Sequence, residues 1–258
     1  MFFKNMVRMI RLLLTTWFFH GMYVLYNIKK VSEGIMDHTE RRDKGMLFLT
    51  DDALVEQMNR VRRLIQRLNA MDRTDIEGIT ALAKVLLNCR GDFLLNPPFY
   101  CDYGYNIEVG DNCLINYNCT FIDVAKIKLG NFCLLGPNVS IYTAGHPIHP
   151  APRNGNYTYG VGVELGDNVW VGGNTVICPG VKIGSNSVIG AGSVATKDIP
   201  AWTVAAGNPC RVIREITEDD RHFYFKDRPL ENKIEEEINE RIREACDPRR
   251  FPVKEEQS

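Results

Sequence analysis

Aliphatic side chains recur every six residues through the middle of this chain. A small residue follows four positions later in most units, and glycine, asparagine or aspartate cluster in between, where turns need residues that tolerate unusual backbone angles. Neither the period of a helix nor the alternation of an ordinary strand fits this spacing. Each unit therefore predicts one short strand and one turn, and their repetition predicts a parallel β-helix with an interior aliphatic column. The column positions are Val109, Ile115, Phe121, Leu129, Leu135, Ile141, Leu165, Val171, Ile177, Ile183 and Ile189.

The composition is that of an ordinary globular protein. The chain has 258 residues, of which 45% are hydrophobic, and a formal net charge of −1. This length is enough for one good core or two unequal domains, and the balanced charge argues against the basic field that nucleic-acid binding needs. Of the eight cysteines, Cys113, Cys119 and Cys133 occupy the small-residue position of the repeat and are predicted to fill the interior. The sequence has no CxxC pair to support a zinc site.

A helical module is predicted before the repeat, over residues 36–96. Asp51 and Asp52 are placed to cap a helix, because a short carboxylate accepts the free N–H groups of the first turn. A second helix is expected from about residue 74 to 87, with Val85 among the residues of its apolar face. Because a β-helix buries its core only by stacking coils, its open ends need caps, and this module is a candidate for one of them.

Two further segments are predicted after the helical module: the β-helix and a C-terminal extension. Two adjacent prolines end the helical structure, and the β-helix is expected over residues 97–216. Residues 217–258 are predicted to form a C-terminal extension whose charged helix carries a narrow stripe of isoleucines. This helix either docks on the assembled protein or lies free.

Residues 1–35 form an apolar N-terminal extension. Its apolar run, residues 12–28, is interrupted by His20 and Asn27 and is shorter than the about 20 residues that a membrane-spanning helix needs. Three interpretations stay open: a marginal membrane anchor, a packing helix, or an extension of little consequence to the fold. We expect a cytoplasmic protein, with possible membrane association limited to residues 1–30.

A loop with the sequence YTAGHPIHP, at residues 142–150, breaks the repeat. It displays two of the five histidines of the chain, His146 and His149. Imidazole titrates near neutral pH, so a histidine held on a loop beside a substrate is suited to act as a general base. A loop histidine in an arbitrary protein is more often a surface residue, so the loop alone does not assign this role.

Several motifs of the chain together support a family resemblance: CDYGYNIEVGDN, YTAGHPIHPAPRN, VELGDNVWVGGNTVICPGVKIG, VIGAGSVATKDIP and AAGNPCRVIREI. They resemble the hexapeptide-repeat sugar O-acetyltransferases, specifically the maltose and galactoside acetyltransferase group, over roughly residues 43–228. The resemblance implies a mainly β fold, a left-handed parallel β-helix with a small N-terminal α-helical domain, which departs from the usual right-handed crossover rule. It also implies acetyl-CoA as co-substrate, no metal, and a homotrimer with active sites between subunits.

The resemblance implies two catalytic residues. His146 matches the general base that acts on an acceptor hydroxyl, which is too weak an acid to attack a thioester unaided. Asn116 matches the asparagine that lies beside this base, although a turn of the solenoid explains an asparagine there as well. His149 is interpreted as a loop residue that lines the acceptor site.

Four aspartates are implied on the acceptor side. Asp102 matches a polar acceptor-site position that is aspartate in maltose-type sequences. Asp51 or Asp52 matches an acceptor-contacting aspartate of the helical domain, with helix capping as an equal explanation. Asp123 is also assigned to the acceptor site, and Val124 follows it where the galactoside enzyme has a further aspartate, which fits the maltose-like pattern better.

The resemblance also implies a groove for acetyl-CoA along the β-helix edge between subunits. Gly173 matches the residue whose backbone N–H faces the thioester, and Ala191 lies beside the pantetheine arm. Trp170 helps to wall the groove. The remaining cofactor-binding residues are Thr196 and Lys197, near the nucleotide end, and Arg211 and Arg214, whose guanidinium groups suit phosphates. For Lys197 and the two arginines, a solvated surface is the alternative.

These observations predict an acetyl-CoA-dependent O-acetyltransferase. The acetyl group would move to a hydroxyl of a maltose-like or glucose-like sugar by direct attack, with no acyl-enzyme. Other readings stay open: a non-sugar hydroxyl or amine acceptor, a non-catalytic β-helix scaffold, and a γ-class carbonic anhydrase with zinc held by three histidines. His20, His38 and His222 lie outside the repeat, which makes the zinc enzyme a poor fit.

Overall fold

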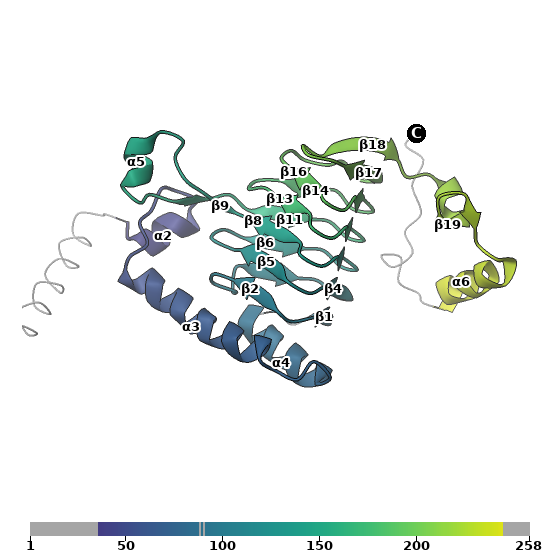
Figure 1. The fold of residues 1–258 in the computed structure, drawn as a ribbon, viewed down its shortest axis with the longest axis horizontal. Helices are drawn as coiled ribbons and strands as arrows, with labels where there is room; N and C mark the ends of the chain where they lie inside the picture. Colours follow the sequence, from purple (N-terminus) through teal and green to yellow (C-terminus); the bar gives the residue numbers. More distant parts are fainter. Residues whose placement is uncertain (1–35, 88, 90, 245–258) are drawn as a thin grey trace, which may run out of the picture.

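The computed structural model describes residues 36–87, 89 and 91–244. The repeat forms a parallel β-helix with helices at its first end, and a C-terminal segment extends from its other end (Figure 1). Each complete coil contributes one strand to each of three sheets, which we name by their first strands.

The three sheets have the following strands. The β1 sheet contains β1 (Phe93–Leu95), β4 (Cys113–Ile115), β7 (Leu134–Leu135), β12 (Trp170–Val171), β15 (Val188–Ile189), β17 (Thr203–Ala206) and β18 (Arg211–Glu215). The β2 sheet contains β2 (Phe99–Cys101), β5 (Cys119–Ile122), β8 (Ser140–Tyr142), β13 (Val176–Ile177) and β16 (Val194–Ala195). The β3 sheet contains β3 (Ile107–Val109), β6 (Ile127–Leu129), β11 (Val163–Leu165) and β14 (Lys182–Ile183). All these strands pair in parallel except β18, which is antiparallel to β17.

The interior of the β-helix is the predicted aliphatic column. All the column positions from Val109 to Ile189 are buried, because alternate residues of each short strand point inward. The small-residue position is buried too, and it carries Cys113 and Cys119 in one coil and Cys133 in the next. The prediction that these cysteines fill the interior is therefore confirmed.

The turns at the corners explain the glycines and asparagines of the repeat. Gly130 lies against the next coil, where an added Cβ would be 2.5 Å from the carbonyl carbon of Gly166. A larger residue would therefore displace a backbone segment. Other corners place asparagine in the left-handed backbone region, which it tolerates better than most residues; the φ angles are 56° to 61° at Asn112, Asn118, Asn138, Asn168, Asn174 and Asn186.

Two helices cover the first end of the β-helix. α3 (Asp52–Asn69) and α4 (Ile76–Leu87) lie against the first coil, and α2 (His38–Asp43) precedes them (Figure 1). The amide of Asn69 donates to the carbonyl of Phe99 at 3.0 Å and accepts the N–H of Phe99 at 2.9 Å. Asn69 therefore completes the edge of the first coil in place of a further strand.

The apolar face predicted for the second helix is wrong at Val85. α4 buries Ile79, Ala83, Leu86 and Leu87, whereas Val85 is 65% exposed. α4 packs by one face on α3 and β1, so the residues at the spacing of that face are buried and Val85 points outward.

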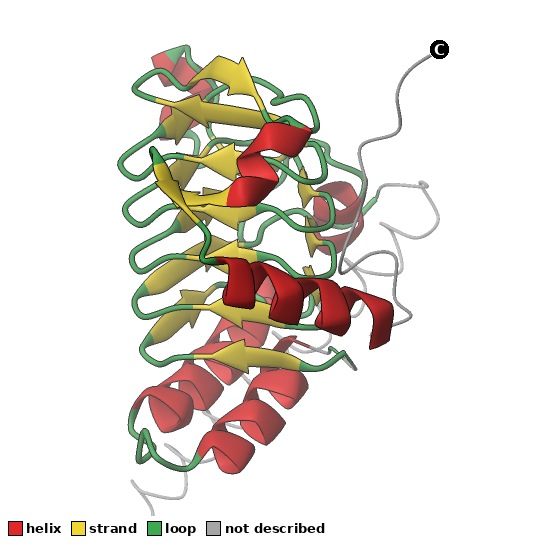
Figure 2. Cartoon of the chain, turned by 90° about the vertical axis from the view of Figure 1, so that its right-hand side faces the viewer, coloured by secondary structure: helices red, strands yellow, loops and turns green. Residues whose placement is uncertain are grey.

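Two excursions leave the β-helix. The first contains β9 (Ala144–Gly145), α5 (Pro150–Asn154) and β10 (Tyr159–Gly160). The second, residues 217–244, is named here the C-terminal arm. It contains η1 (Glu218–His222), β19 (Phe223–Phe225), β20 (Arg228–Pro229) and α6 (Asn232–Glu244), and it lies to the side of the β-helix on which β1, β4 and β17 lie (Figures 1 and 2).

The structure contradicts the possible membrane association that was predicted from the sequence. Within residues 36–87, 89 and 91–244, no helix is long and apolar enough to cross a membrane. The apolar run at residues 12–28, on which the possible membrane association depended, lies outside the described residues. The membrane association is therefore not retained.

Candidate active site

The loop that breaks the repeat is held at both ends. β9 and β10 pair antiparallel at its base, with Tyr159 opposite Gly145 and Gly160 opposite Ala144. α5 lies near its tip, and the Nδ1 atom of His149 accepts the N–H of Ala151 at 3.2 Å as the N-cap of this helix. His149 therefore has a structural contact within the loop itself.

His146 follows β9 directly and is exposed. Its Nδ1 atom lies 3.0 Å from the carbonyl oxygen of Tyr157. A carbonyl oxygen can only accept a hydrogen bond, so Nδ1 of the neutral ring carries the proton in this contact and Nε2 keeps its lone pair. The geometry thus gives His146 the tautomer that a general base needs at Nε2.

The loop is tied to the helical module. Phe48 and Thr158 exchange both backbone hydrogen bonds, at 2.9 and 3.0 Å. Phe48 lies in a buried apolar cluster with Leu54, Tyr103 and Val124. Through this cluster, the start of α3 and the loop meet at one corner of the β-helix.

The two aspartates at the start of α3 differ in role, because Asp51 caps the helix and Asp52 does not. Asp51 is the N-cap and accepts the N–H of Leu54 at 3.0 Å, which confirms the capping prediction for Asp51. Asp52 is the first residue of α3 and is exposed. Capping occupies one oxygen of Asp51, so Asp52 presents the freer carboxylate to the surface.

Asp102 and Asp123 lie on successive coils at this same corner, after β2 and β5. Oδ1 of Asp123 accepts the N–H groups of Asp102 at 2.8 Å and of Tyr103 at 2.9 Å. Its Oδ2 atom is buried and has no hydrogen-bond partner among the described residues. Burial raises the pKa of Asp102, and the positive charge of Arg62 on α3 opposes this. Asp123 therefore shapes the turn that carries Asp102.

Burial raises the pKa of Asp123 from its ordinary 3.8 to about 7, with backbone N–H groups opposing the shift. Between about pH 4 and pH 7 the folded protein thus holds a proton that the unfolded chain releases. The contribution of Asp123 to the free energy of unfolding should therefore fall as pH rises through this range, by at most about 1.4 kcal/mol per pH unit. Asp123→Asn removes this dependence.

Denaturant unfolding of the wild type and of Asp123→Asn at pH 4.5, 6 and 7.5 checks this expectation. The other titrating groups are shared, so the difference between the two proteins isolates Asp123. The wild type should lose stability relative to the variant with each rise in pH. A difference that stays constant over the three pH values would contradict the raised pKa.

The residues assigned to acetyl-CoA begin at a different edge of the β-helix. Gly173 and Ala191 occupy successive corners between the β1 and β2 sheets, and Trp170 points outward from β12 beside them. Among the described residues, no acceptor partners the backbone N–H of either Gly173 or Ala191. Asn116 lies at the same edge, where its Oδ1 atom accepts the N–H of Tyr117 at 2.9 Å. This edge thus offers free N–H donors beside an exposed indole.

The residues assigned to the nucleotide end lie in and beyond the last coil. Thr196 and Lys197 are exposed after β16, and Arg211 opens β18. Arg214, also on β18, forms a two-pronged ion pair with Asp220, with N···O distances of 2.7 and 2.8 Å. This pair raises the pKa of Arg214 and lowers that of Asp220. A phosphate at Arg214 would therefore compete with a carboxylate already in place.

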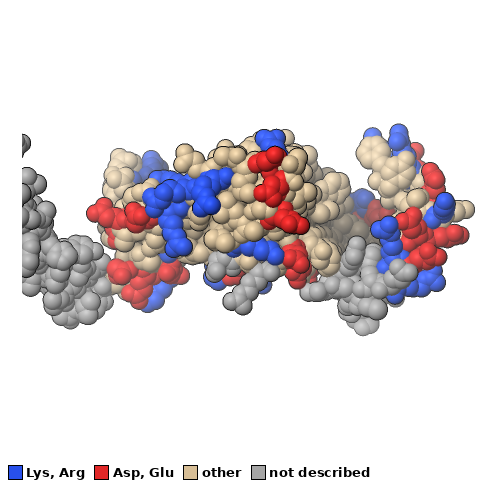
Figure 3. Space-filling view, turned by 90° about the horizontal axis from the view of Figure 1, so that it is seen from below, with Lys and Arg blue, Asp and Glu red and all other residues tan. Residues whose placement is uncertain are grey.

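A basic surface lies next to the corner that carries Asp102 and Asp123. The outward face of α3 carries exposed arginines, including Arg62. Figure 3 views the end of the molecule that holds α3 and α4, and Lys and Arg side chains gather over part of it. A hollow of about 520 Å³ between α3 and β2 contains Arg62, Tyr100 and Cys101 in its wall. Asp102 follows Cys101 directly, so this corner places carboxylates beside a positively charged rim.

Within one chain, the predicted site residues lie at two different edges of the β-helix. Asp51, Asp102, Asp123 and the His146 loop meet at the corner between the β2 and β3 sheets, whereas Asn116, Gly173 and Ala191 line the corner between the β1 and β2 sheets. Within the described chain, no hydrogen bond joins His146 to Asn116. The two residues predicted to be catalytic thus lie at different edges of the single chain.

Two features of the corner between the β2 and β3 sheets were not found in the sequence. The carbonyl of Tyr157 orients His146, and a backbone contact of this kind leaves no sequence signal. Arg42 is buried, with its guanidinium carbon 4.5 Å from the centre of the Tyr103 ring and 5.6 Å from that of Tyr105. A basic residue in a short polar helix gave no indication of this burial.

Known proteins share this architecture. The bacterial transferase hexapeptide family (six repeats) matches residues 162–197. The chain is 43% identical over 202 residues to galactoside O-acetyltransferase of Escherichia coli (strain K12), covering 77% of this chain and 99% of that protein. A maltose O-acetyltransferase from Clostridium difficile 630 superposes with a TM-score of 0.70 at 45% identity, over 71% of this chain and 99% of that one. A galactoside acetyltransferase in complex with coenzyme A superposes with a TM-score of 0.73 at 42% identity. The match covers 76% of this chain and 100% of that one.

These similarities confirm the predicted fold class. It is a left-handed parallel β-helix with a small N-terminal helical part and a C-terminal helical tail. The identity extends over nearly the whole length of the galactoside enzyme, and therefore includes the helical module as well as the repeat. The chain belongs to the hexapeptide-repeat sugar O-acetyltransferases and is an acyltransferase.

Proposed function

We propose that this protein transfers the acetyl group of acetyl-CoA to a hydroxyl of a maltose-like or glucose-like sugar, with His146 as the general base. The observation that carries the proposal is the geometry of His146. Its Nδ1 atom is held by the carbonyl of Tyr157 at 3.0 Å, which leaves Nε2 free on an exposed loop. The 43% identity to a galactoside O-acetyltransferase supports acetyl transfer to a sugar.

In the proposed reaction, Nε2 of His146 takes the proton of the acceptor hydroxyl as its oxygen attacks the thioester carbonyl carbon. The tetrahedral intermediate collapses with cleavage of the carbon–sulfur bond. The imidazolium then returns its proton to the departing sulfur, so the products are the acetyl ester and free CoA thiol. The free N–H of Gly173 would donate to the oxyanion, which forms only as the carbonyl is attacked.

The acetyl-CoA groove would follow the edge on which Gly173 and Ala191 lie. The free N–H groups of these two residues support the placement of the thioester and pantetheine arm there. Trp170 would wall the groove, and Thr196, Lys197 and Arg211 would meet the nucleotide. Arg214 would join them only by exchanging Asp220 for a phosphate.

On the acceptor side, Asp102 would accept hydrogen bonds from sugar hydroxyls, together with Asp51 or Asp52. Asp123 is fully buried in the single chain, so it would act through the turn that it holds. Val124 lies in the apolar cluster with Phe48 and Leu54, so this position offers no carboxylate to a sugar, and we assign a maltose-like rather than a galactoside acceptor on that ground.

Because the site residues lie at two edges of one chain, we assign the active protein as a homotrimer in which adjacent subunits share each site. Asn116 of one subunit would then meet His146 of its neighbour. We divide the chain accordingly into three parts after residue 35. These are a helical domain (residues 36–96), a catalytic β-helix (residues 97–216) and a C-terminal extension (residues 217–258).

Release of free CoA thiol tests the function. The purified protein is incubated with acetyl-CoA and a panel of mono- and disaccharides, non-sugar alcohols and amines. Thiol release that depends on a glucose-type sugar supports the proposal. If release depends only on a non-sugar alcohol or amine, the acceptor is that compound class and not a sugar. No release with any acceptor, together with no binding of CoA, would favour a scaffold instead.

A further inference from the structure

The hollow between α3 and β2, named here the α3–β2 hollow, has a volume of about 520 Å³. One face of α3 lines it, because residues three, four and seven positions apart lie on the same side of a helix. Tyr100 and Cys101 of β2 form the opposite wall. The remaining wall residues are Arg62, Ile65, Gln66, Asn69 and Ala70. The hollow is therefore built by a helix and a strand rather than by loops.

Tyr100 gives the α3–β2 hollow an aromatic wall. Its side chain points outward from β2, between the buried residues Phe99 and Cys101, and the residue is 47% exposed. Within the described part of the chain, its hydroxyl group has no hydrogen-bond partner. An outward residue does not touch the interior column, so the β-helix itself does not require an aromatic ring at this position. The ring and the hydroxyl group of Tyr100 are therefore available to a ligand.

The polar side chains of the α3–β2 hollow keep free hydrogen-bond donors. Arg62 is exposed, and its Nη1 atom donates to Oδ1 of Asn59 at 3.1 Å. Among residues 36–87, 89 and 91–244, no carboxylate lies within ion-pair distance of Arg62. The side-chain amide of Gln66 is exposed and has no hydrogen-bond partner in the same residues. The hollow thus offers a guanidinium group and an amide to a ligand, opposite an aromatic ring.

The α3–β2 hollow adjoins the proposed acceptor site. Tyr100 and Asp102 are two residues apart at the end of β2, so they share the outer face of this strand and lie about 7 Å apart along it. This separation is close to the step from one pyranose ring to the next in a disaccharide. Burial raises the pKa of Asp102, and the positive charge of Arg62 opposes this rise. The guanidinium group of the hollow therefore also acts on the acceptor-side carboxylate.

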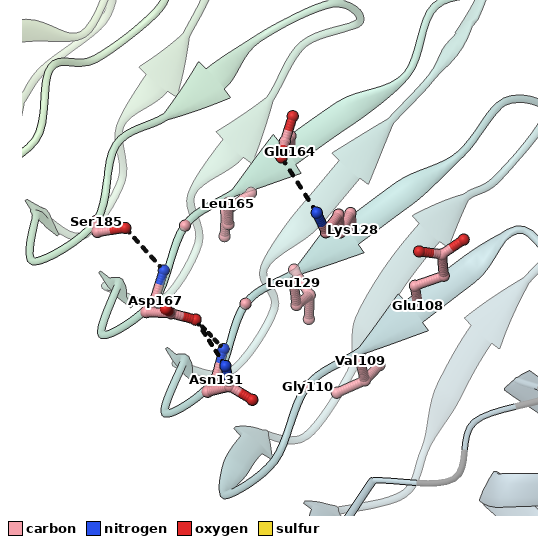
Figure 4. Close-up of a pocket in the computed structure, with 12 residues that line it drawn as sticks. Glu108, Val109, Gly110, Lys128, Leu129, Asn131, Glu164, Leu165, Asp167 and Ser185 are labelled. Carbon is pink, nitrogen blue, oxygen red and sulfur yellow. Dashed lines mark hydrogen bonds and ion pairs between the residues drawn. The ribbon is translucent and has the colours of Figure 1, made fainter. Parts of the chain in front are cut away.

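A second hollow, of about 450 Å³ on the outer face of the β3 sheet, is different in character (Figure 4). Its polar side chains pair with one another: Lys128 lies 3.5 Å from Glu164, and Oδ1 of Asp167 accepts the side-chain amide of Asn131 at 2.9 Å. The described residues of its wall include no aromatic side chain. Its polar groups are thus satisfied within the chain, and it lacks the aromatic wall of the α3–β2 hollow.

We infer that the α3–β2 hollow is a subsite for the second ring of a disaccharide acceptor, so that the protein acts on disaccharides in preference to monosaccharides. The C–H face of an uncharged pyranose ring packs on Tyr100, while Arg62 and Gln66 donate to its hydroxyl groups. The first ring then lies at Asp102, beside the His146 loop. The carboxylate of Asp102 at the edge of the hollow repels an anionic ring. The subsite rests on the proposed function, because it binds the acceptor of that same reaction.

The rates of thiol release with maltose and with glucose test the subsite in the full-length protein. The kcat/KM of the wild type for maltose should exceed that for glucose by at least about tenfold. Tyr100→Ala should lower kcat/KM for maltose about tenfold more than kcat/KM for glucose, because only the disaccharide reaches the ring. Tyr100→Phe keeps the ring and should retain most of the preference for maltose.

Two arginine variants provide a matched comparison for the wall on α3. Arg62→Ala removes a donor of the hollow and should reduce the preference for maltose. Arg63→Ala removes the neighbouring arginine, which is outside the hollow and lies 3.2 Å from Glu56, and should leave the preference unchanged. Circular dichroism confirms that each variant is folded; if Tyr100→Ala is not, Arg62→Ala decides.

Sugar binding without acetyl-CoA separates the subsite from the reaction. Titration calorimetry should show tighter binding of maltose than of glucose, and Tyr100→Ala should remove this difference. If no sugar supports thiol release but the difference in binding is found, the proposed function fails and the subsite stands. If glucose and maltose support release equally, the function stands and the subsite fails. A preference for maltose that persists unchanged in both Tyr100→Ala and Arg62→Ala would also overturn the subsite.

Discussion

His146→Ala should lower the kcat of sugar-dependent thiol release by a factor of about one hundred or more, because removal of a positioned general base typically costs that much. The KM values for acetyl-CoA and for the sugar should change little, since the base acts mainly in the transition state. The loss follows from the geometry at Nδ1, which leaves Nε2 as the only ring atom able to take a proton. Steady-state kinetics of the purified variant measure it.

A matched histidine variant separates catalysis from structure. His38→Ala also removes an imidazole, whose Nδ1 accepts the N–H of Leu49 at 3.1 Å, but His38 has no place in the proposed site. It should retain most of the activity. Equal losses in His38→Ala and His146→Ala, or an unchanged kcat in His146→Ala, would remove His146 from the mechanism while leaving the family assignment intact.

Phe121→Ala should lower the free energy of unfolding by about 3–5 kcal/mol. Phe121 is fully buried in the interior column, and its ring packs edge-on against that of Phe99, with centroids 5.2 Å apart and an angle of 85° between the planes. Stacked coils on both sides hold the neighbouring side chains in place, so the cavity left by alanine can collapse only in part. Denaturant unfolding followed by circular dichroism measures the change.

The control for this stability change is the adjacent residue, Thr120, which points outward from the same strand. Thr120→Ala should change stability by about 0.5 kcal/mol or less, as surface substitutions do. Phe121→Leu keeps most of the volume and should lie between the two. If Phe121→Ala unfolded no more easily than Thr120→Ala, the interior column would not be the main source of stability at this coil.

The site was predictable from the sequence only in part. The loop around His146 interrupts a regular repeat, so its exposure could be foreseen, and Asp51 lay at a recognisable helix start. The contact between His146 and the carbonyl of Tyr157 could not be foreseen, because a backbone atom eleven residues along the chain supplies it. The burial of Asp123 and the pairing of Arg214 with Asp220 likewise depend on how separate turns meet.

The sequence by itself determined the β-helix and its interior. The six-residue period states, within each short unit, which residue points inward and where the chain must turn, and stacking repeats that local rule. Only the tertiary structure decided which face of α4 is buried and at which edges the site residues gather. These outcomes depend on contacts between residues far apart in the chain, and no local period encodes them.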